Sequence, residues 1–453
     1  MNMKKLKLST THIILLSFLI VIFIGTALLC LPVSSADGRG ASFVDALFTA
    51  TTSTCVTGLV VAPTVSAWST FGHIVMLVLI QVGGLGVITV MASLSVFLHR
   101  RMGLSDRVLV QDAFNLDSLA GLGDFVKKVI KGSLLIEGVG ALLYMTVFVP
   151  RFGVRGIWIS VFNSVSAFCN AGIDIIGENS LCDYATHPVI NLVTSLLIVF
   201  GGLGYIVWWD VIRLIKGRLN GKKSGLKSLT LHSKIVLTTT AGLLLGGGTL
   251  FLLFEYNNPL TMGGMPFFDK IQVAFFQSVT TRTAGFAGVP QENLTNASAI
   301  LSLLLMFIGG SPIGTAGGIK TVTFAVIIAS AISSVKNKDS VDLFNREITR
   351  QTIAKAVAVA CTSGFIVVVS TLLLSVATPD AEVIDIAFET VSATATVGLS
   401  RNLTSSLNAF GKLIIIATMY FGRVGPISLA VALNLRKQNN SVIKNPTEDI
   451  RVG

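Results

Sequence analysis

The chain has 453 residues, of which 52% are hydrophobic and only 13% are charged. A soluble protein of this length would carry roughly 25% charged residues to keep its surface in water. The shortage of charge excludes a soluble globular protein, because even a large soluble domain buries only about three quarters of the surface of its chain. We therefore expect an integral membrane protein.

The net charge of +11 comes from 34 Lys and Arg residues against 23 Asp and Glu residues. In a soluble chain such an excess would suggest nucleic acid as a partner. Here 25 of the 34 cations fall in five segments between or beyond the apolar runs, namely 4–7, 100–131, 213–234, 336–355 and 436–453. This is the positive-inside pattern of membrane proteins. It predicts a multi-pass plasma-membrane protein with both termini in the cytoplasm, and no nucleic acid as a partner.

The first apolar run, Ile13–Val33, has 21 residues. That length matches the ~20 residues that cross a bilayer and exceeds the ~7 to 15 of a signal-peptide core. A cleaved signal peptide ending near Ser34, Ser35 and Ala36 is the alternative. Further runs lie at about 70–98, 125–149, 188–215, 232–255, 297–334, 353–377 and 408–434. Together the runs predict eight transmembrane helices, an even number, as two cytoplasmic termini require.

Between the members of each pair of spans lies a shorter apolar segment rich in Ser and Thr. These segments cover about 42–57, 157–171, 267–284 and 383–397. They are too short to span, so we expect re-entrant half-helices, whose open backbone ends are tolerated at membrane depth only beside protein or a water-filled cavity. The short segments therefore predict a cavity within the membrane.

The short segments repeat. They align without gaps as FTATTSTCVTGL from Phe48, FNSVSAFCNAGI from Phe162, FFQSVTTRTAGF from Phe275 and FETVSATATVGL from Phe388. Their glycines, Gly58, Gly172, Gly285 and Gly398, are separated by 114, 113 and 113 residues. The period predicts an all-α integral membrane protein made of four tandem helix, pore loop and helix repeats around a pseudo-four-fold central pore. The expected boundaries are 1–100, 101–217, 218–335 and 336–437, followed by a cytoplasmic tail at 438–453.

Four half-helices that end near one axis would present four C-terminal dipole ends, each carrying roughly half a negative charge. Backbone carbonyls around a glycine can replace the hydration shell of a cation. The four stretches that end in these glycines, residues 54–58, 168–172, 281–285 and 394–398, contain no acidic side chain. Their lack of acidic side chains favours K⁺ over Ca²⁺ or Mg²⁺. The alternative is that the glycines only allow close helix packing. The candidate K⁺-binding filter residues are Thr54, Cys55, Val56, Thr57, Gly58, Phe168, Cys169, Asn170, Ala171, Gly172, Thr281, Arg282, Thr283, Ala284, Gly285, Thr394, Ala395, Thr396, Val397 and Gly398.

The second span of each repeat carries a glycine motif. In QVGGLGV (Gln81–Val87) and FGGLGYI (Phe200–Ile206) no strand precedes the glycines, so helix packing is favoured over a phosphate-binding loop. In GGSPIGTAGGIKT (Gly309–Thr321), five glycines and one proline within ten residues must break the helix. We expect this break to form a gating loop below the filter, with a static kink as the alternative.

In the fourth motif, FGRVGPIS (Phe421–Ser428), Arg423 is expected near the centre of the last span, where an ionised residue is costly and marks a functional site. The alternative is an ion pair away from the pore. Lys320 is either part of the gate or extends to the membrane interface. The candidate gating residues are Gly309, Gly310, Ser311, Pro312, Gly314, Thr315, Gly317, Gly318, Lys320 and Arg423.

These motifs resemble those of the Trk/Ktr/HKT superfamily of potassium transporters, over about Thr11 to Lys437. The eight spans resemble most the ion-translocating subunit of bacterial Ktr systems. The resemblance implies K⁺ uptake through a glycine filter closed by the intramembrane loop, a homodimer, and control by a cytosolic RCK-type nucleotide-binding ring like KtrA. It also allows Na⁺ as an activator. The second filter departs from the first, with Asn170 and Ala171 in place of Val56 and Thr57, which leaves a Na⁺-permeable or poorly selective cation channel as the alternative.

No strand-flanked GxGxxG motif occurs, so we expect no organic cofactor on this chain and nucleotide control from another chain. The basic segments 213–234 and 336–350 are candidates for docking that chain or anionic lipid. A secondary solute transporter is a weaker reading, because it would normally have inverted repeats and polar substrate ligands. A membrane enzyme is weaker still, because the five histidines are scattered and no HExxH or GxSxG motif occurs.

Overall fold

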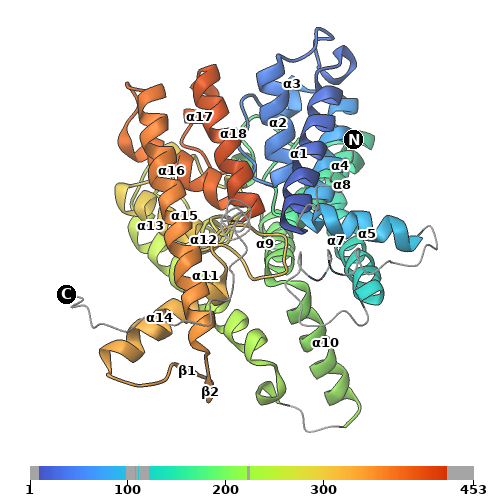
Figure 1. Ribbon diagram of the computed structural model, residues 1–453. Helices are drawn as coiled ribbons and strands as arrows, with labels where there is room; N and C mark the ends of the chain where they lie inside the picture. The colour runs from blue at the N-terminus through green and yellow to red at the C-terminus, as the bar shows by residue number, and fades with distance from the viewer. Residues whose placement is uncertain (1–9, 98–107, 109–110, 112–121, 222–224, 426–453) are drawn as a thin grey trace, which may run out of the picture.

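The computed structural model describes residues 10–97, 108, 111, 122–221 and 225–425 (Figure 1). The described part is mostly helical, as expected. Its strands form one short hairpin, in which β1 (Asp342–Leu343) pairs antiparallel with β2 (Arg346–Glu347).

Four long helices are apolar enough to cross a membrane: α1 (Thr10–Leu29), α7 (Leu122–Phe152), α11 (Leu231–Glu255) and α15 (Arg350–Ala377). They correspond to the first expected span of each repeat. Large apolar side chains along them, such as Leu135, Leu245 and Phe365, are exposed. In water such faces would be costly, whereas lipid is as apolar as they are. The four helices therefore fit a membrane environment.

Two of the expected second spans are not straight. Helix α4 (Thr70–Leu85) meets α5 (Val87–Phe97) at 95°, and α9 (Pro188–Leu203) meets α10 (Tyr205–Leu219) at 101°. The bends lie at Gly86 and Gly204, whose φ angles are +88° and +83°. A positive φ ends an α-helix and is adopted readily only by glycine. The apolar runs 70–98 and 188–215 are therefore each broken by a sharp bend. The described helices give four spans, or six if each bent pair counts as one, and the number eight stays a prediction.

The other two second spans are also interrupted. Helices α13 (Asn296–Phe307) and α14 (Thr321–Val335) are separated by non-helical residues 308–320, here called the intramembrane loop. The helix break expected over Gly309–Gly318 is therefore confirmed. Helix α18 (Ala409–Val424) ends at Gly425, which has φ +91°, and Arg423 lies in its last turn. The predicted continuation to residue 434 lies outside the described residues.

A short helix occupies each of the four short apolar segments: α2 (Phe43–Cys55), α8 (Val154–Cys169), α12 (Phe267–Thr280) and α16 (Val383–Ala395). Each packs against the long helix that precedes it in the chain. Their last turns are buried although they are rich in Ser and Thr. These four helices are called the short helices below.

The gapless alignment of the short helices needs one correction. Phe48, Phe162 and Phe388 are fully buried, whereas the aligned Phe275 is 38% exposed and its neighbour Phe276 takes the buried place. Helix α12 is thus offset by one residue relative to the other short helices. Nine positions separate Phe276 from Gly285, where ten separate each of the other buried phenylalanines from its glycine, and a comparison of glycine spacings does not reveal this.

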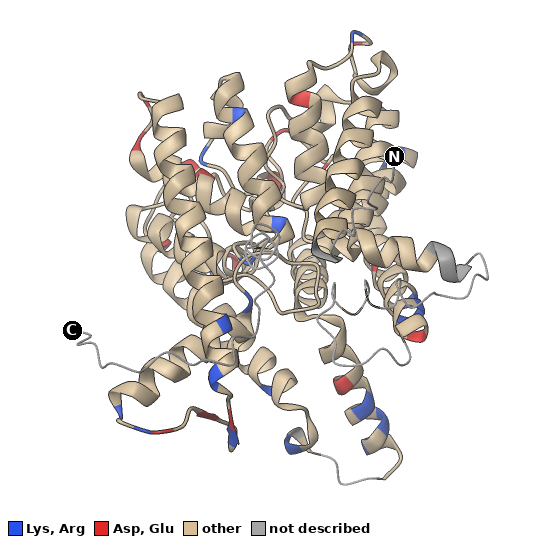
Figure 2. Cartoon of the chain, viewed as in Figure 1, with Lys and Arg blue, Asp and Glu red and all other residues tan. Residues whose placement is uncertain are grey.

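The remaining elements are small connections. They comprise α3 (Thr64–Ala67), α17 (Leu403–Ser406) and 3₁₀ turns at Pro32–Ser34, Cys182–Tyr184, Leu226–Ser228 and Gln291–Asn293. Helix α10, helix α14 and the β hairpin extend together at the bottom of Figure 1. Lys and Arg residues gather on this same side, while the body of the helices carries few charges (Figure 2).

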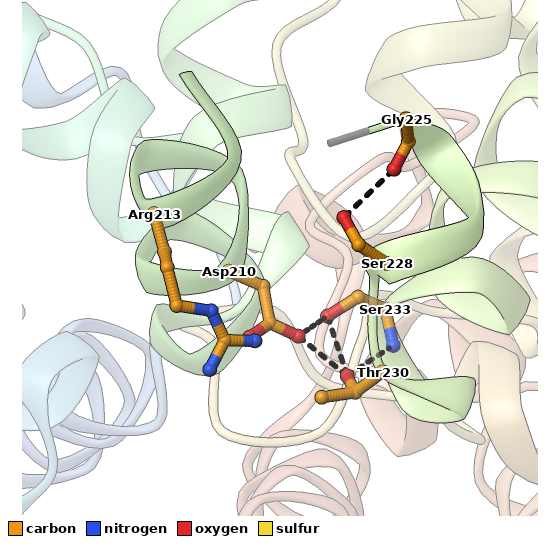
Figure 3. A network of polar contacts seen from close by, with 6 residues as sticks. All are labelled: Asp210, Arg213, Gly225, Ser228, Thr230 and Ser233. Atoms are coloured by element: carbon orange, nitrogen blue, oxygen red, sulfur yellow. Dashed lines mark hydrogen bonds and ion pairs between the residues drawn. The ribbon is translucent and has the colours of Figure 1, made fainter. Parts of the chain in front are cut away.

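A carboxylate joins α10 to α11 on this basic side (Figure 3). Buried Asp210 accepts hydrogen bonds from the hydroxyls of Thr230 and Ser233 at the start of α11, the latter at 2.6 Å. Arg213, one turn further along α10, pairs with Asp210 at 2.6 Å. The end of the second repeat is therefore fixed to the start of the third.

Candidate ion pathway

Each short helix leads into a chain reversal two residues before its glycine. Val56, Asn170 and Thr396 adopt the left-handed conformation as C-terminal caps of α2, α8 and α16, and Thr283 has φ +61° after α12. For a β-branched residue this conformation is strained by about 1 to 3 kcal/mol. Such strain at Val56, Thr283 and Thr396 persists only where the surroundings enforce it, and the same conformation at one register in all four repeats points to a functional constraint.

The four signature glycines meet. All have positive φ: +100° at Gly58, +65° at Gly172, +81° at Gly285 and +98° at Gly398. A Cβ added at Gly58 would lie 2.5 Å from the carbonyl oxygen of Ala171, and one at Gly172 would lie 2.6 Å from that of Ala284.

The same relation closes the ring. A Cβ at Gly285 would overlap the carbonyl oxygen of Val397, and one at Gly398 would overlap that of Thr57. Each glycine thus faces the carbonyl that precedes the next glycine, and the fourth faces the first. Any side chain at these positions would enter a neighbouring backbone, so only glycine fits. This closed arrangement is called the glycine ring below.

The earlier residues of the four stretches contact the second helices. A Cβ at Gly83, Gly201 or Gly422 would overlap the carbonyl oxygen of Thr54, Phe168 or Thr394, respectively. The packing role predicted for the glycines of QVGGLGV and FGGLGYI is therefore confirmed at Gly83 and Gly201, although Gly86 and Gly204 of the same motifs bend the helices. Close packing fixes the ends of the short helices against the second helices.

Above the glycine ring lies a cavity of about 550 Å³, here called the vestibule. All four signature glycines line it, together with Asp174, Glu178, Asp183 and Glu292. No Lys or Arg is among the described residues that line it. Burial raises the pKa of Asp174 to about 6. A cavity lined by one sign of charge concentrates the opposite ion, so the vestibule attracts cations.

These vestibule carboxylates are absent from the residues predicted as the site. Asp174 follows Gly172 by two residues, and the others lie in the connections that follow the second and third glycines. Their common position after a filter stretch is the signal that would have identified them.

The intramembrane loop lies against the opposite side of three of the four stretches. The Thr315 hydroxyl donates to Asn170 Oδ1 at 2.8 Å and contacts the Phe168 carbonyl at 3.1 Å. The Gly317 amide donates to Thr283 Oγ1 at 3.2 Å, and a Cβ at Gly317 would overlap Thr396 Oγ1. The loop therefore contacts the second, third and fourth stretches directly.

Backbone hydrogen bonds attach the loop to the second repeat at the bend between α9 and α10. The amides of Ser311 and Thr315 donate to the carbonyls of Gly202 and Gly201, at 2.8 and 3.1 Å. The Tyr205 amide donates to Ile313 at 3.1 Å. The bend at Gly204, which exposes these backbone groups, thus provides the seat of the loop.

Three cations from the sequence motifs converge on the intramembrane loop. Arg423 donates to the carbonyls of Thr315 at 2.7 Å and of Gly83 at 2.6 Å, so its described partners are carbonyls and not the carboxylate of an ion pair. Arg282, predicted within the filter, directs its guanidinium to Gly309 at 3.0 Å. Lys320 folds back and donates to the carbonyl oxygen of Ala316 at 2.6 Å.

Below the intramembrane loop lies a second cavity, of about 370 Å³. It is called the loop cavity and is lined by Gly314, Gly317, Gly318, Lys320 and Arg423 from the candidate gate, and by Gly86 and Gly425 at the helix breaks. The described residues that line the loop cavity and those that line the vestibule do not overlap. The glycine ring and the loop lie between the two cavities.

Comparison with known proteins supports a transport role. A family model described as TrkH, cation transport protein, matches residues 4–443. The chain is 38% identical to the potassium/sodium uptake protein NtpJ of Enterococcus hirae, covering 99% of this chain and 98% of that one. It is also 38% identical to the Ktr system potassium uptake protein B of Bacillus subtilis, with the same coverage. The crystal structure of the potassium transporter TrkH from Vibrio parahaemolyticus has the same fold, with a TM-score of 0.74 at 16% identity, covering 96% of this chain and 86% of that one.

Proposed function

Because the chain belongs to the TrkH family of cation transport proteins, we propose that it carries K⁺ into the cell across the plasma membrane. The ion passes from the vestibule through the glycine ring into the loop cavity. The observation that carries the proposal is the ring itself, formed by the one glycine that follows each of the four short helices, at the base of a carboxylate-lined cavity. The names of the relatives, potassium/sodium uptake protein and potassium uptake protein B, support K⁺ as the transported ion.

The filter acts through backbone dipoles. Carboxylates of the vestibule raise the local concentration of cations without entering the four stretches. At the ring, carbonyls such as those of Thr57, Ala171, Ala284 and Val397 replace water around the ion. A ring of carbonyls without fixed negative charge suits a large, weakly hydrated monovalent cation. The candidate filter residues that carry side chains serve mainly to hold this backbone in place.

The intramembrane loop is the gate of this pathway. It lies directly beneath three of the four stretches, and Arg423 fastens it to the end of α4. The positive charges of Arg423 and Lys320 border the loop cavity and repel a cation leaving the ring. Opening requires the loop to leave the underside of the ring, which breaks the contacts of Arg423 with Thr315.

We further propose that the chain works as a homodimer under a cytosolic RCK-type nucleotide-binding ring, with Na⁺ as an activator. The printed name of the Bacillus subtilis relative, a protein B of a Ktr system, supports a system of several components. The face that carries α10, α14 and the β hairpin is rich in Lys and Arg and fits the cytoplasmic side (Figure 2). This orientation gives eight spans, both termini in the cytoplasm, and the basic segments as contacts for the ring or for anionic lipid.

A Na⁺-permeable or weakly selective cation channel is the second candidate. The four stretches differ in sequence, and the Enterococcus hirae relative is named a potassium/sodium uptake protein. A secondary transporter of organic solutes has less support, since the glycine ring leaves no room for side chains, let alone a solute.

Growth of a bacterium that lacks its own K⁺ uptake systems tests the proposal. The gene, expressed with and without a candidate regulatory ring, should restore growth on low K⁺. A Gly58→Ser variant that reaches the membrane in equal amount serves as the matched control and should not. Failure of the natural sequence under both conditions contradicts K⁺ uptake. Growth that becomes sensitive to Na⁺ supports the weakly selective channel.

A further inference from the structure

A buried hydroxyl near the end of each short helix bonds to the backbone of its own repeat, either at the signature glycine or at the residue that follows it. These four residues, here called the filter hydroxyls, are Thr52, Ser166, Thr280 and Ser392, and all are completely buried. In each repeat their main-chain oxygen also accepts a backbone amide from the stretch, from Thr57, Ala171, Ala284 and Val397 at 2.8 to 3.0 Å. The candidate filter residues do not include them, and neither the fold nor the proposed gate requires a hydroxyl there.

The filter hydroxyls divide into two pairs. In the first and fourth repeats, the oxygen of Thr52 accepts the amide of Gly58, and that of Ser392 accepts the amide of Gly398, both at 3.0 Å. In the second and third repeats the hydroxyl donates, from Ser166 to Ile173 O at 2.5 Å and from Thr280 to Phe286 O at 2.6 Å.

The backbone of the glycine ring shows the same division. The φ angles are +100° and +98° where the hydroxyl accepts the glycine amide, at Gly58 and Gly398, but +65° and +81° at Gly172 and Gly285. The four glycines therefore form two pairs, Gly58 with Gly398 and Gly172 with Gly285. The φ angle of the glycine correlates with whether the hydroxyl of its repeat accepts or donates a hydrogen bond.

The consequence follows from the planarity of the peptide bond. The Gly58 amide and the Thr57 carbonyl belong to one trans peptide, so they point in opposite directions. Holding the amide toward Thr52 on the short helix turns the Thr57 carbonyl the other way, toward the neighbouring Gly398 of the ring. Ser392 does the same for the Val397 carbonyl, which faces Gly285.

We propose that Thr52 and Ser392 are specificity-determining positioning residues that aim the carbonyls of Thr57 and Val397 into the ion pathway. The inference rests on the proposed function and adds to it two residues outside the four stretches. Without the hydroxyl, a buried glycine amide has no acceptor, which is costly. Rotation of that peptide then offers the amide to the pathway in place of the carbonyl and weakens the coordination of K⁺ relative to Na⁺.

The test measures Rb⁺ and Na⁺ fluxes of the purified full chain in liposomes, with and without its regulatory ring. In Thr52→Val and Ser392→Ala the ratio of Rb⁺ to Na⁺ flux should fall by about tenfold, equivalent to about 1.4 kcal/mol. Thr52→Ser and Ser392→Thr keep the hydroxyl and should restore the ratio to within about twofold of the natural protein. Thr51→Val is the matched control, because among the described residues the buried Thr51 hydroxyl bonds to Leu47 O of its own helix and not to a filter stretch.

The outcomes separate the two proposals. Absence of Rb⁺ flux in the natural protein contradicts the proposed function. A natural protein that selects Rb⁺, together with an unchanged ratio in folded Thr52→Val and Ser392→Ala, overturns the positioning role alone. Size-exclusion chromatography and thermal unfolding establish that the variants are folded. Ser392→Ala removes a single oxygen, so it decides the question if Thr52→Val does not fold, and failure of both to fold while Thr51→Val folds makes the hydroxyls structural and also overturns the proposal.

Discussion

Replacing Arg423 with alanine releases the intramembrane loop from the end of α4. The guanidinium joins Thr315 of the loop to Gly83 of the first repeat, at 2.7 and 2.6 Å. The hydroxyl of Thr315 is in turn bonded to Asn170 in the second stretch. Loss of Arg423 therefore removes the one described side chain that connects the loop to the first repeat, and it also removes a positive charge from the wall of the loop cavity.

The magnitude follows from the two hydrogen bonds. A hydrogen bond to a charged group contributes about 1.5 to 3 kcal/mol. Water from the adjoining cavity compensates for part of the free energy lost with the two hydrogen bonds. We therefore take the free energy of one such bond as the net stabilisation of the closed loop that is lost. Each 1.4 kcal/mol changes a population tenfold. If the closed loop predominates, the open fraction should rise by about 10- to 100-fold, and the lost charge acts in the same direction by lowering the electrostatic barrier.

Rubidium uptake into liposomes, measured at equal amounts of folded protein, checks this prediction. Arg423→Ala should increase the flux by at least about tenfold in liposomes that contain this chain alone. Arg423→Lys keeps the charge but cannot reproduce the geometry by which the guanidinium bonds to two carbonyls at once. Its Rb⁺ flux should therefore lie between those of Arg423→Ala and the natural protein. An equal or lower flux in folded Arg423→Ala would refute the assignment of Arg423 and the loop as a barrier.

Three further changes test other parts of the account. Gly317→Ala places a Cβ against Thr396 Oγ1 and 2.6 Å from the Ala395 carbonyl oxygen. The resulting overpacking, about 1 to 3 kcal/mol, should displace the loop and raise Rb⁺ flux. An unchanged flux would show that the loop does not pack against these residues. Because burial raises the pKa of Asp174 to about 6, its negative charge is present at pH 7 and largely lost at pH 5. The half-saturating K⁺ concentration for uptake should therefore rise several-fold when the pH falls from 7 to 5. Asp174→Asn should show the higher half-saturating concentration at both pH values. Asp210→Ala removes the acceptor shared by Thr230 and Ser233 and should lower the free energy of unfolding by about 1 to 3 kcal/mol, measured by thermal unfolding. Arg213→Ala should lower it by less than about 1 kcal/mol, because the Arg213 side chain is 67% exposed.

Much of the fold could be predicted because the lipid environment leaves a strong record in sequence. A helix in lipid needs an apolar run of a definite length, which marks α1, α7, α11 and α15. The positions of the four glycines could also be predicted, since a backbone ring that excludes every Cβ admits no other residue.

The bends at Gly86 and Gly204 could not be predicted in the same way. Hydropathy measures composition, and the apolar run continues through the bend from α4 into α5 and from α9 into α10. The one-residue offset of α12 was hidden for a related reason, because Phe275 and Phe276 are equivalent in hydropathy but only Phe276 is buried.

Side-chain direction is the other limit. Arg282 lies between filter residues in sequence, yet its long side chain reaches Gly309 in the loop. Thr52 and Ser392 share a register with Ser166, but only their hydrogen bonds distinguish acceptor from donor. Position along a helix predicts which residues are neighbours and does not predict which atom faces which.

The central claim is that K⁺ crosses the membrane through the glycine ring. Its most direct test is the ratio of Rb⁺ to Na⁺ flux in liposomes for the natural protein, Gly58→Ser and Gly398→Ser. We predict a natural protein that prefers Rb⁺ and a much lower preference in both variants, since a side chain at either glycine enters a neighbouring backbone. A natural protein without Rb⁺ flux, with or without a regulatory ring, or an unchanged ratio in both folded variants, would contradict the claim.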